Sequence, residues 1–481
     1  MSTVSGDIQI QQILPLRFVH ASDLHLERTI EGVTEAPAHW EQRMLDISRR
    51  AAARLFQYCI DEEIDFLLLS GNVLNANVSP PGVLLFLLEQ FERLKKAGIA
   101  VYWAGGEFDS PDDWSTAFPL PENVHHFPGN SIQEYYFHRK AGAESSPVAK
   151  IAGMSRNQHR KRIRVSEFPL ESGGLYTIAV ANGEVEPETL AQRSIDYWAM
   201  GGSAKRHTFH GKAAERGTRS EERGLDGRRQ TADSHSPKPY IVHYPGAVLA
   251  RSPHDTGLYG ATLVEIPLDE SGQLADEPLL TPFSTSPIRW VNDRVVLDAA
   301  DDAGKLADEL RQRIKNYREQ QKTEDLLINW LIDVPPGQLM FNLRKGNLAA
   351  DLLSELRSMY GQEEPMTWSV SIVPLIPDQL AKPHYEQQTI LGDFLRSIKH
   401  FQDNPAELLH LEAYIPKNWE HEEALKHLLL AEKITDEITD VSDAEENTPK
   451  ERWEQHPHQK ETQQKVLREA AVAGLELFSQ N

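Results

Sequence analysis

The chain has 481 residues, of which 40% are hydrophobic and 25% charged, so it can form two or three domains with buried cores. Its net charge of -22 opposes broad attraction to nucleic acid, although a local basic patch can act against the net field. The single cysteine, Cys59, excludes an internal disulfide and is predicted to be a small core residue. Because no apolar run approaches about 18 residues and no signal pattern opens the chain, we expect a cytoplasmic protein that does not contact a membrane.

After a predicted flexible lead-in (residues 1–15), the run RFVHASDLHLE contains an apolar strand followed by Asp23 and His25. Side chains two positions apart at a strand end point the same way, because direction alternates along a strand. A carboxylate and an imidazole that face one pocket can hold a divalent transition metal. The Asp-x-His pair alone is equally compatible with a hydrogen-bonded polar pair at a strand end.

Later strand ends have similar polar or glycine-rich exits. The predicted strand 66–69 opens into Gly71-Asn72, and the run VYWAGG enters a turn region at 105–111. Two further runs, LYTIAVANGE and SIDYWAMGG, end in the same way. Helical segments separate the early strands, and in open α/β folds sites assemble at the C-terminal ends of such strands. The pattern therefore predicts an α/β domain with a polar site at these loops.

These motifs resemble the calcineurin-like metallophosphoesterase superfamily, whose members read Asp-x-His, Gly-Asp, Gly-Asn-His-Asp, a lone His and Gly-His-x-His. More narrowly, the chain is similar to the DNA repair exonuclease branch, the SbcD-like nuclease subunits that work beside an SMC-like ATPase. Three later motifs support that branch: Tyr244-Pro245-Gly246, Arg251-Ser252-Pro253 and Thr256-Gly257. The resemblance covers about residues 16–292. It implies an α/β (α+β) class, a four-layer sandwich of two mixed β-sheets flanked by helices, and a site for two divalent metal ions such as Mn²⁺.

The chain departs from the family pattern at most ligand positions. Asp23 and His25 keep the family's residue types. The other positions are occupied by Asn72 for the bridging Asp, Glu107 for the Asn, Asn182 for the lone His, and Gly202 and Ala204 for the final His pair. Phe108 stands where the family has its catalytic His, and the neighbouring Asp109 is the remaining catalytic candidate.

Each replacement weakens hydrolytic chemistry. A neutral amide cannot offset the charge of two cations that lie about 3.5–4 Å apart. Phe108 cannot donate a proton to a leaving oxygen. We therefore predict at most one weakly bound divalent ion, held by Asp23, His25, Asn72 and Glu107, with Asn182 as a further ligand position.

A shifted register would bring His207 and His210 to the final His pair. However, the run DYWAMG at 196–201 matches the family just before that pair. We therefore interpret these histidines as the start of a surface insertion.

That insertion, residues 205–239, is polar and poor in aliphatic residues, so we predict disorder. It carries Arg216, Arg219, Arg223, Arg228 and Arg229. They could contact DNA, but interspersed glutamate and aspartate residues favour a solvated insertion.

The chain then predicts a small α/β unit (293–378), with helices at 303–320 and 346–361 and two strands, which resembles the branch's capping domain. An acidic, helical region (379–481) follows. An apolar face near its end is formed by Val466, Leu467, Leu475, Leu477 and Phe478. It could bind the coiled coil of an SMC-like ATPase or pack on its own domain.

Two functional hypotheses follow from these features. The first is a catalytically impaired protein of the DNA repair exonuclease type that acts as a structural subunit in DNA processing. The alternative is an active metal-dependent exonuclease or phosphodiesterase with an altered, one-metal site. A second copy of the chain and DNA are further partners to consider.

Overall fold

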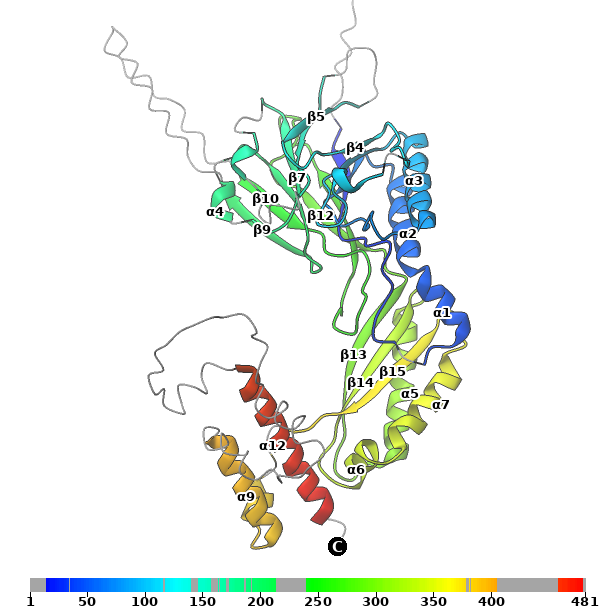
Figure 1. Cartoon of the computed structure of the whole chain (residues 1–481), viewed down its shortest axis with the longest axis vertical. Helices are drawn as coiled ribbons and strands as arrows, with labels where there is room; N and C mark the ends of the chain where they lie inside the picture. Colours follow the sequence, from blue (N-terminus) through cyan, green and yellow to red (C-terminus); the bar gives the residue numbers. More distant parts are fainter. Residues whose placement is uncertain are drawn as a thin grey trace, which may run out of the picture. The chain divides into compact units, whose positions relative to one another are not determined.

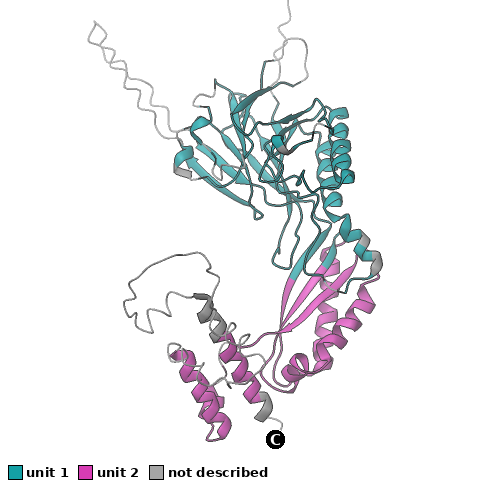
Figure 2. Ribbon diagram, in the orientation of Figure 1, with its two compact units in different colours: residues 1–291, 323–326 teal, residues 292–322, 327–481 magenta. Residues whose placement is uncertain are grey.

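The structure, a computed structural model, describes residues 14–33, 35–115, 117–139, 146–156, 163, 165–169, 173–185, 187–191, 193–212, 239–377, 380, 382–404 and 457–478. Contacts divide the chain into two units (Figure 2), residues 1–291 with 323–326, and residues 292–322 with 327–481. Among the described residues, no helix has the length and apolar character needed to cross a membrane.

The first sheet of unit 1 has six strands in the order β12-β11-β1-β2-β3-β4. Its strands are β1 (Leu16–Ala21), β2 (Phe66–Leu69), β3 (Ala100–Trp103), β4 (Val124–His126), β11 (Gly260–Ile266) and β12 (Leu279–Ser284). Strands β1 to β4 pair in parallel, whereas β11 pairs antiparallel with both β1 and β12. The C-terminal ends of β1, β2 and β3 therefore meet at one edge.

The second sheet also has six strands, in the order β5-β6-β7-β8-β10-β9. Its strands are β5 (Gln133–Phe137), β6 (Ala149–Gly153), β7 (Tyr176–Asn182), β8 (Tyr197–Gly201), β9 (His207–Lys212) and β10 (Pro239–Tyr244). The inner strands β6, β7, β8 and β10 are parallel, and the two edge strands are antiparallel to their neighbours.

Apolar residues from both sheets form one core between them. Phe18 of β1 stacks on Phe66 of β2 and meets Tyr197 of β8 edge-on. These three side chains are fully buried, and they belong to one cluster with residues of β6, β7 and β11. Near-continuous apolar runs suit strands that are covered on both faces.

Helices cover the outer face of the first sheet (Figure 1). They are α2 (Ile47–Asp61) and α3 (Pro81–Lys96), and the shorter helix α1 (Ala38–Leu45) precedes α2 and contacts it. Helix α2 contacts β11 and helix α3 contacts β3. Buried Ala51, Leu55 and Cys59 recur every four residues on α2, the spacing of one helical face, so the core position predicted for Cys59 is confirmed. A second cluster, with α4 (Pro187–Leu190), covers the outer face of the other sheet. The predicted sandwich of two mixed sheets flanked by helices is confirmed.

One part of the sequence prediction was wrong. The segment predicted to be disordered from residue 205 begins with β9, which pairs antiparallel with β10 from Lys212 opposite Pro239 to His207 opposite Tyr244. The low aliphatic content misled the prediction, because backbone hydrogen bonds and the stacking of His207 on Tyr244 order this strand. The five arginines named above lie outside the described residues.

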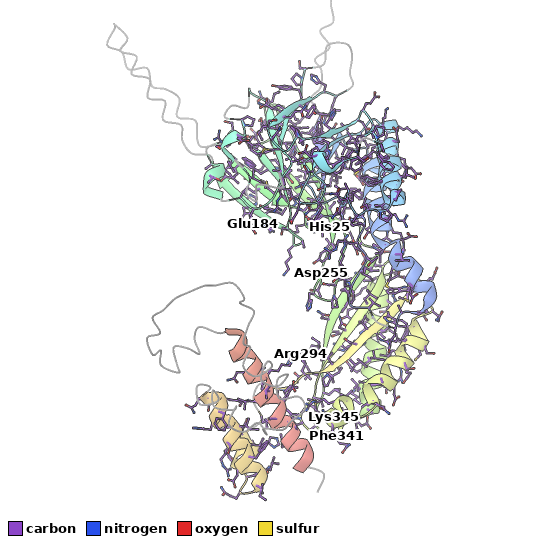
Figure 3. All side chains as sticks on the ribbon, in the orientation of Figure 1. His25, Glu184, Asp255, Arg294, Phe341 and Lys345 are labelled. Atoms are coloured by element: carbon purple, nitrogen blue, oxygen red, sulfur yellow. The ribbon has the colours of Figure 1, made fainter. Side chains whose placement is uncertain are left out.

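Unit 2 contains a three-stranded sheet in the order β13-β14-β15. The elements are β13 (Ile288–Val296), α5 (Ala303–Gln320), β14 (Asp325–Asp333), α6 (Gln338–Arg344), α7 (Leu348–Tyr360) and β15 (Thr367–Pro374). Buried Asp293 of β13 binds Arg313 and Tyr317 of α5, which fixes that helix on one face of the sheet. Arg294 has its side chain on the other face and pairs with Asp333 (Figure 3).

The described C-terminal helices are α8 (Lys382–Glu386), α9 (Ile390–Asp403) and α12 (Pro457–Phe478). Helices α9 and α12 pack on one another. Leu467 and Leu475 of α12 are buried, whereas Ile390 of α9 is 76% exposed. Part of the apolar face predicted on α12 is therefore used inside the chain.

Candidate functional site

The site forms where the loops after β1 and β2 run side by side. The backbone N–H of Asp23 donates to Gly71 O at 3.0 Å, and that of His25 donates to Asn72 O at 3.0 Å. Asp23, His25 and Asn72 have φ values of +55°, +43° and +56°, in the left-handed region that residues other than glycine seldom adopt. Such unusual backbone angles concentrate at functional sites, where the surrounding structure holds them in place.

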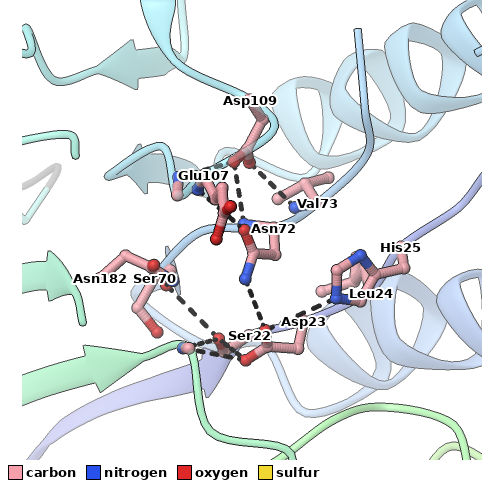
Figure 4. Close-up of polar contacts among 12 residues, drawn as sticks. Ser22, Asp23, Leu24, His25, Ser70, Asn72, Val73, Glu107, Asp109 and Asn182 are labelled. Atoms are coloured by element: carbon pink, nitrogen blue, oxygen red, sulfur yellow. Dashed lines mark hydrogen bonds and ion pairs between the residues drawn. The ribbon is translucent and has the colours of Figure 1, made fainter. Parts of the chain in front are cut away.

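Asp23 is the centre of a hydrogen-bond network (Figure 4). Its Oδ1 accepts from Asn72 Nδ2 at 2.8 Å, and its Oδ2 accepts from Ser22 Oγ at 2.5 Å and from the backbone N–H of Gly202 at 3.0 Å. Burial acts to raise the pKa of this carboxyl, but nearby His25 and the hydrogen bonds outweigh burial and lower it. Both oxygens of Asp23 are thus engaged by protein donors.

The side chain of Asn72 connects two loops. Its Nδ2 donates to Asp23 after β1, and its Oδ1 accepts the backbone N–H of Glu107 after β3 at 3.0 Å. Asn72 is 7% exposed. Because the two ends of the amide have different partners, its orientation follows from the network.

Asp109 is fully buried beneath these loops. Its carboxylate accepts the backbone N–H groups of Asn72, Val73 and Gly106 and the indole N–H of Trp103. Burial raises the pKa of Asp109 to about 6, although its four donors act in the opposite direction. A saturated carboxylate without access to solvent anchors a loop. This geometry therefore favours a structural role over the catalytic role considered for this residue.

His25, labelled in Figure 3, belongs to the first unit, and its imidazole lies between two carboxylates. Its Nε2 is 3.7 Å from Asp23 Oδ1, and its Nδ1 is 3.8 Å from Glu27 Oε1. Burial acts to lower the pKa of His25, but the two carboxylates outweigh it and raise the pKa. The ring of Phe108 meets the imidazole edge-on, with 6.0 Å between ring centroids. The two carboxylates therefore stabilise the protonated imidazole relative to the neutral one.

Arg251, part of the Arg-Ser-Pro motif, binds the loop after β1 that contains Asp23 and His25. Its guanidinium is buried and donates to the carbonyl oxygens of Leu24 at 2.5 Å and His25 at 3.2 Å. Burial lowers the pKa of Arg251 to about 10. This motif, which carried part of the family resemblance, therefore holds the Asp-x-His loop in position.

The other predicted ligands are used differently. The Glu107 side chain is 57% exposed, with its carboxylate 3.4 Å from Arg156. Buried Asn182 donates from Nδ2 to Ser70 O at 2.7 Å, and its Oδ1 has no hydrogen-bond partner among the described residues. The side chains of His25 and Asn72 thus both lie next to the Asp23 carboxylate. Glu107 contacts this group only through its backbone N–H, which donates to Asn72 Oδ1.

The two positions of the missing His pair, Gly202 and Ala204, follow β8. Gly202 has φ +86° and contributes only its backbone N–H to Asp23. His207 and His210 lie instead on β9, where His207 Nδ1 donates to Lys205 O at 2.9 Å and the His207 ring stacks on Tyr244. His207 contacts Lys205, Phe209 and Tyr244, and His210 lies opposite Ile241 of β10, so the structure gives no support to a shifted register.

Sequence reasoning missed Ser22, Ser70 and Glu27 as parts of the site. Ser22 and Ser70 each follow the last residue of a parallel strand, and Glu27 is two residues beyond His25. Their nearness to the Asp-x-His and Gly-Asn motifs was the available signal. Which backbone groups they contact could only come from the tertiary structure.

The sandwich, with a polar site at the C-terminal ends of its parallel strands, is consistent with a metallophosphoesterase fold. The chain is 25% identical over 374 residues, 74% of this chain and 81% of the relative, to uncharacterized metallophosphoesterase YhaO of Bacillus subtilis (strain 168). This similarity supports a place in the metallophosphoesterase superfamily. No family model matches the chain.

Such a fold implies divalent metal ions, but the side chains present do not fit a two-metal centre. Asp23 has both oxygens engaged, and the bridging position carries the neutral Asn72. Across the described part of the chain, no group of three or more His, Cys, Asp or Glu side chains is arranged to hold a metal ion. We therefore derive no reaction step through a metal.

Proposed function

We propose that this chain is a metallophosphoesterase-fold protein of the DNA repair exonuclease type that is catalytically impaired and acts as a structural subunit in DNA processing. The observation that carries the proposal is the closed network in which Asn72 Nδ2 binds Asp23 Oδ1 at 2.8 Å. A hydrogen bond between these two groups occupies the place where a bridging carboxylate would bind cations.

The lack of an acid at position 108 supports the same proposal. General acid catalysis requires a side chain that can release a proton toward the leaving oxygen. Phe108 cannot do so, and Asp109 next to it is fully buried. Neither a clamp for two metals nor a proton donor is therefore provided by the residues at these positions.

For the partner, we propose an SMC-like coiled-coil ATPase that contacts the C-terminal helices. Leu467 and Leu475 are buried, so the contact would use exposed residues of α9 such as Ile390 and Phe394. Apolar side chains on an exposed helix face are typical of helix-to-helix recognition. Co-purification of the full chain with a coiled-coil ATPase from the same cells tests this, and loss of the complex in Ile390→Ser is expected.

The alternative is an active exonuclease or phosphodiesterase with one Mn²⁺ or other divalent ion. The position of His25, within 4 Å of both Asp23 and Glu27, favours this alternative. Against it stands the Asp23 carboxylate, whose two oxygens already accept from Asn72 Nδ2 and from the Gly202 backbone N–H.

The deciding experiment combines calorimetric titration with Mn²⁺ and digestion of linear duplex DNA by the full chain. We expect no tight binding of two ions and no digestion above that of Asp23→Ala. Tight binding of two ions, with digestion that Asp23→Ala abolishes, would overturn the impaired assignment. Weak binding of one ion with the same loss of digestion would establish the one-metal alternative.

A further inference from the structure

Three loops that are distant in the sequence meet at the side chain of Asn72. The amide binds the Asp23 carboxylate at 2.8 Å on one side and the Glu107 backbone N–H at 3.0 Å on the other. Its own backbone N–H donates to Asp109 at 2.9 Å. One residue after β2 therefore joins the loops that follow β1 and β3.

The space around this amide is already filled. A Cβ atom added to Gly106 would lie 2.3 Å from Asn72 Oδ1, and one added to Gly71 would lie 2.7 Å from the Gly106 backbone nitrogen. Both distances are shorter than any van der Waals contact. The loops thus approach one another closely enough to be joined by direct hydrogen bonds.

An aspartate could not form the same connection. In an aspartate, a carboxylate oxygen would take the place of the amide Nδ2. That oxygen cannot donate, and it would face Asp23 Oδ1 with like charge at hydrogen-bond distance. In a buried site such repulsion is weakly screened. Asparagine also tolerates the left-handed φ of +56° at this position better than most residues.

We propose that the Asn72 side chain holds the loops after β1 and β3 together in place of a bridging cation. The fold of the first unit is therefore independent of divalent metal. The amide donates to the Asp23 carboxylate and accepts the Glu107 backbone N–H, so the two loops are joined without a bound ion. The inference rests on the misfit to a two-metal centre described above, and not on a role in DNA processing.

Thermal unfolding of the full chain in EDTA and in MnCl₂ tests the proposal. The native protein should have the same Tm in both, within about 1 °C. Asn72→Asp should lower Tm in EDTA by about 5 °C or more, and MnCl₂ should restore most of it by offsetting the paired carboxylates. The exposed variant Asn130→Asp, which adds the same charge away from the site, should match the native protein in both conditions.

Hydrogen exchange of Asn72→Ala provides a second measurement that does not depend on the stability of the charged variant. The Glu107 amide, which donates to Asn72 Oδ1, should exchange at least about tenfold faster. The Gly106 amide, which donates to Asp109 at 2.6 Å, should stay protected.

Three results would overturn the proposal: stabilisation of the native protein by Mn²⁺, equal Tm for Asn72→Asp and Asn130→Asp in EDTA, or unchanged exchange at Glu107. DNA digestion by the native protein would instead contradict the proposed function, so the two failures are distinguishable.

Discussion

Trp103 and Asp109 are joined by a hydrogen bond of 2.9 Å from the indole N–H to a buried carboxylate oxygen. Trp103 is the last residue of β3, and Asp109 lies at the far end of the loop that follows it. That loop contains Glu107 and Phe108. The bond therefore closes this loop on its own strand. His126 of β4 stacks on the other side of the indole, with 4.0 Å between ring centroids.

Replacing Asp109 should destabilise the first unit. Asp109→Asn puts an amide N–H₂ toward backbone and indole donors, so buried N–H groups lose their acceptor. We expect a loss of about 3 kcal/mol in the free energy of unfolding, measured by urea denaturation. The exposed Asp112→Asn serves as the control. Equal stability of the two variants would show that Asp109 does not anchor the loop.

Arg251 is expected to be irreplaceable by lysine. Arg251→Lys keeps the charge but loses the planar group that donates to both Leu24 O and His25 O. The free energy of unfolding should fall by about 2 kcal/mol, since buried carbonyl oxygens lose their donors. The matched change at exposed Arg28, whose partner is Glu31, should be nearly neutral. A neutral Arg251→Lys would contradict the supporting role.

Stability should decrease in acid through two buried histidines between the sheets. His243 binds Thr208 and Thr262, and its ring lies 5.6 Å from that of His20. Burial lowers the pKa of His243 to about 3, with smaller effects of Arg206 and His207, and lowers that of His20 well below its usual value.

Because each of these histidines takes up a proton near pH 6.5 in the unfolded chain but not in the folded one, each makes a contribution to the free energy of unfolding. That contribution is fully present above about pH 6.5. It is lost as the pH falls toward the folded pKa, by roughly 2 kcal/mol for each histidine between pH 7 and pH 5. His243→Gln should remove its share of this dependence, measured by urea denaturation at both values. The exposed control His254→Gln should not. An identical pH dependence in both variants would argue against a neutral buried His243.

Restoring the family's residues should have unequal effects. Asn72→Asp with Phe108→His should raise Mn²⁺ affinity in calorimetry, because it adds a carboxylate and an imidazole. Gly202→His should instead reduce stability, since φ at this position is +86° and a Cβ would lie 3.2 Å from Asn182 Oδ1. Gly202→Ala meets both the φ penalty and the close contact and is expected to cost about 1 kcal/mol or more. Gly272→Ala, at φ +78° in open space, meets the φ penalty alone, and Gly82→Ala meets neither. Flat affinity in the double variant would place the error in the proposed alignment.

The strands and the loops that carry the site could be predicted from the residues, and the sandwich followed from the family resemblance. Apolar runs that end at Gly71-Asn72 and at the Gly105-Gly106 turn predict where strands lie and where they end. Such patterns can be recognised because they depend on only a few neighbouring residues. The same local reading failed at β9, because strand pairing with β10 is supplied by residues about thirty positions later.

Only the tertiary structure decided what the site residues do. Asp23 receives the backbone N–H of Gly202, 179 positions away, and Arg251 reaches Leu24 from 227 positions away. Residue types in a sequence state which hydrogen bonds a group is able to make, but not which partners burial will supply. For that reason the hydrogen-bond network around Asp23 and Asn72 became visible only in the folded chain.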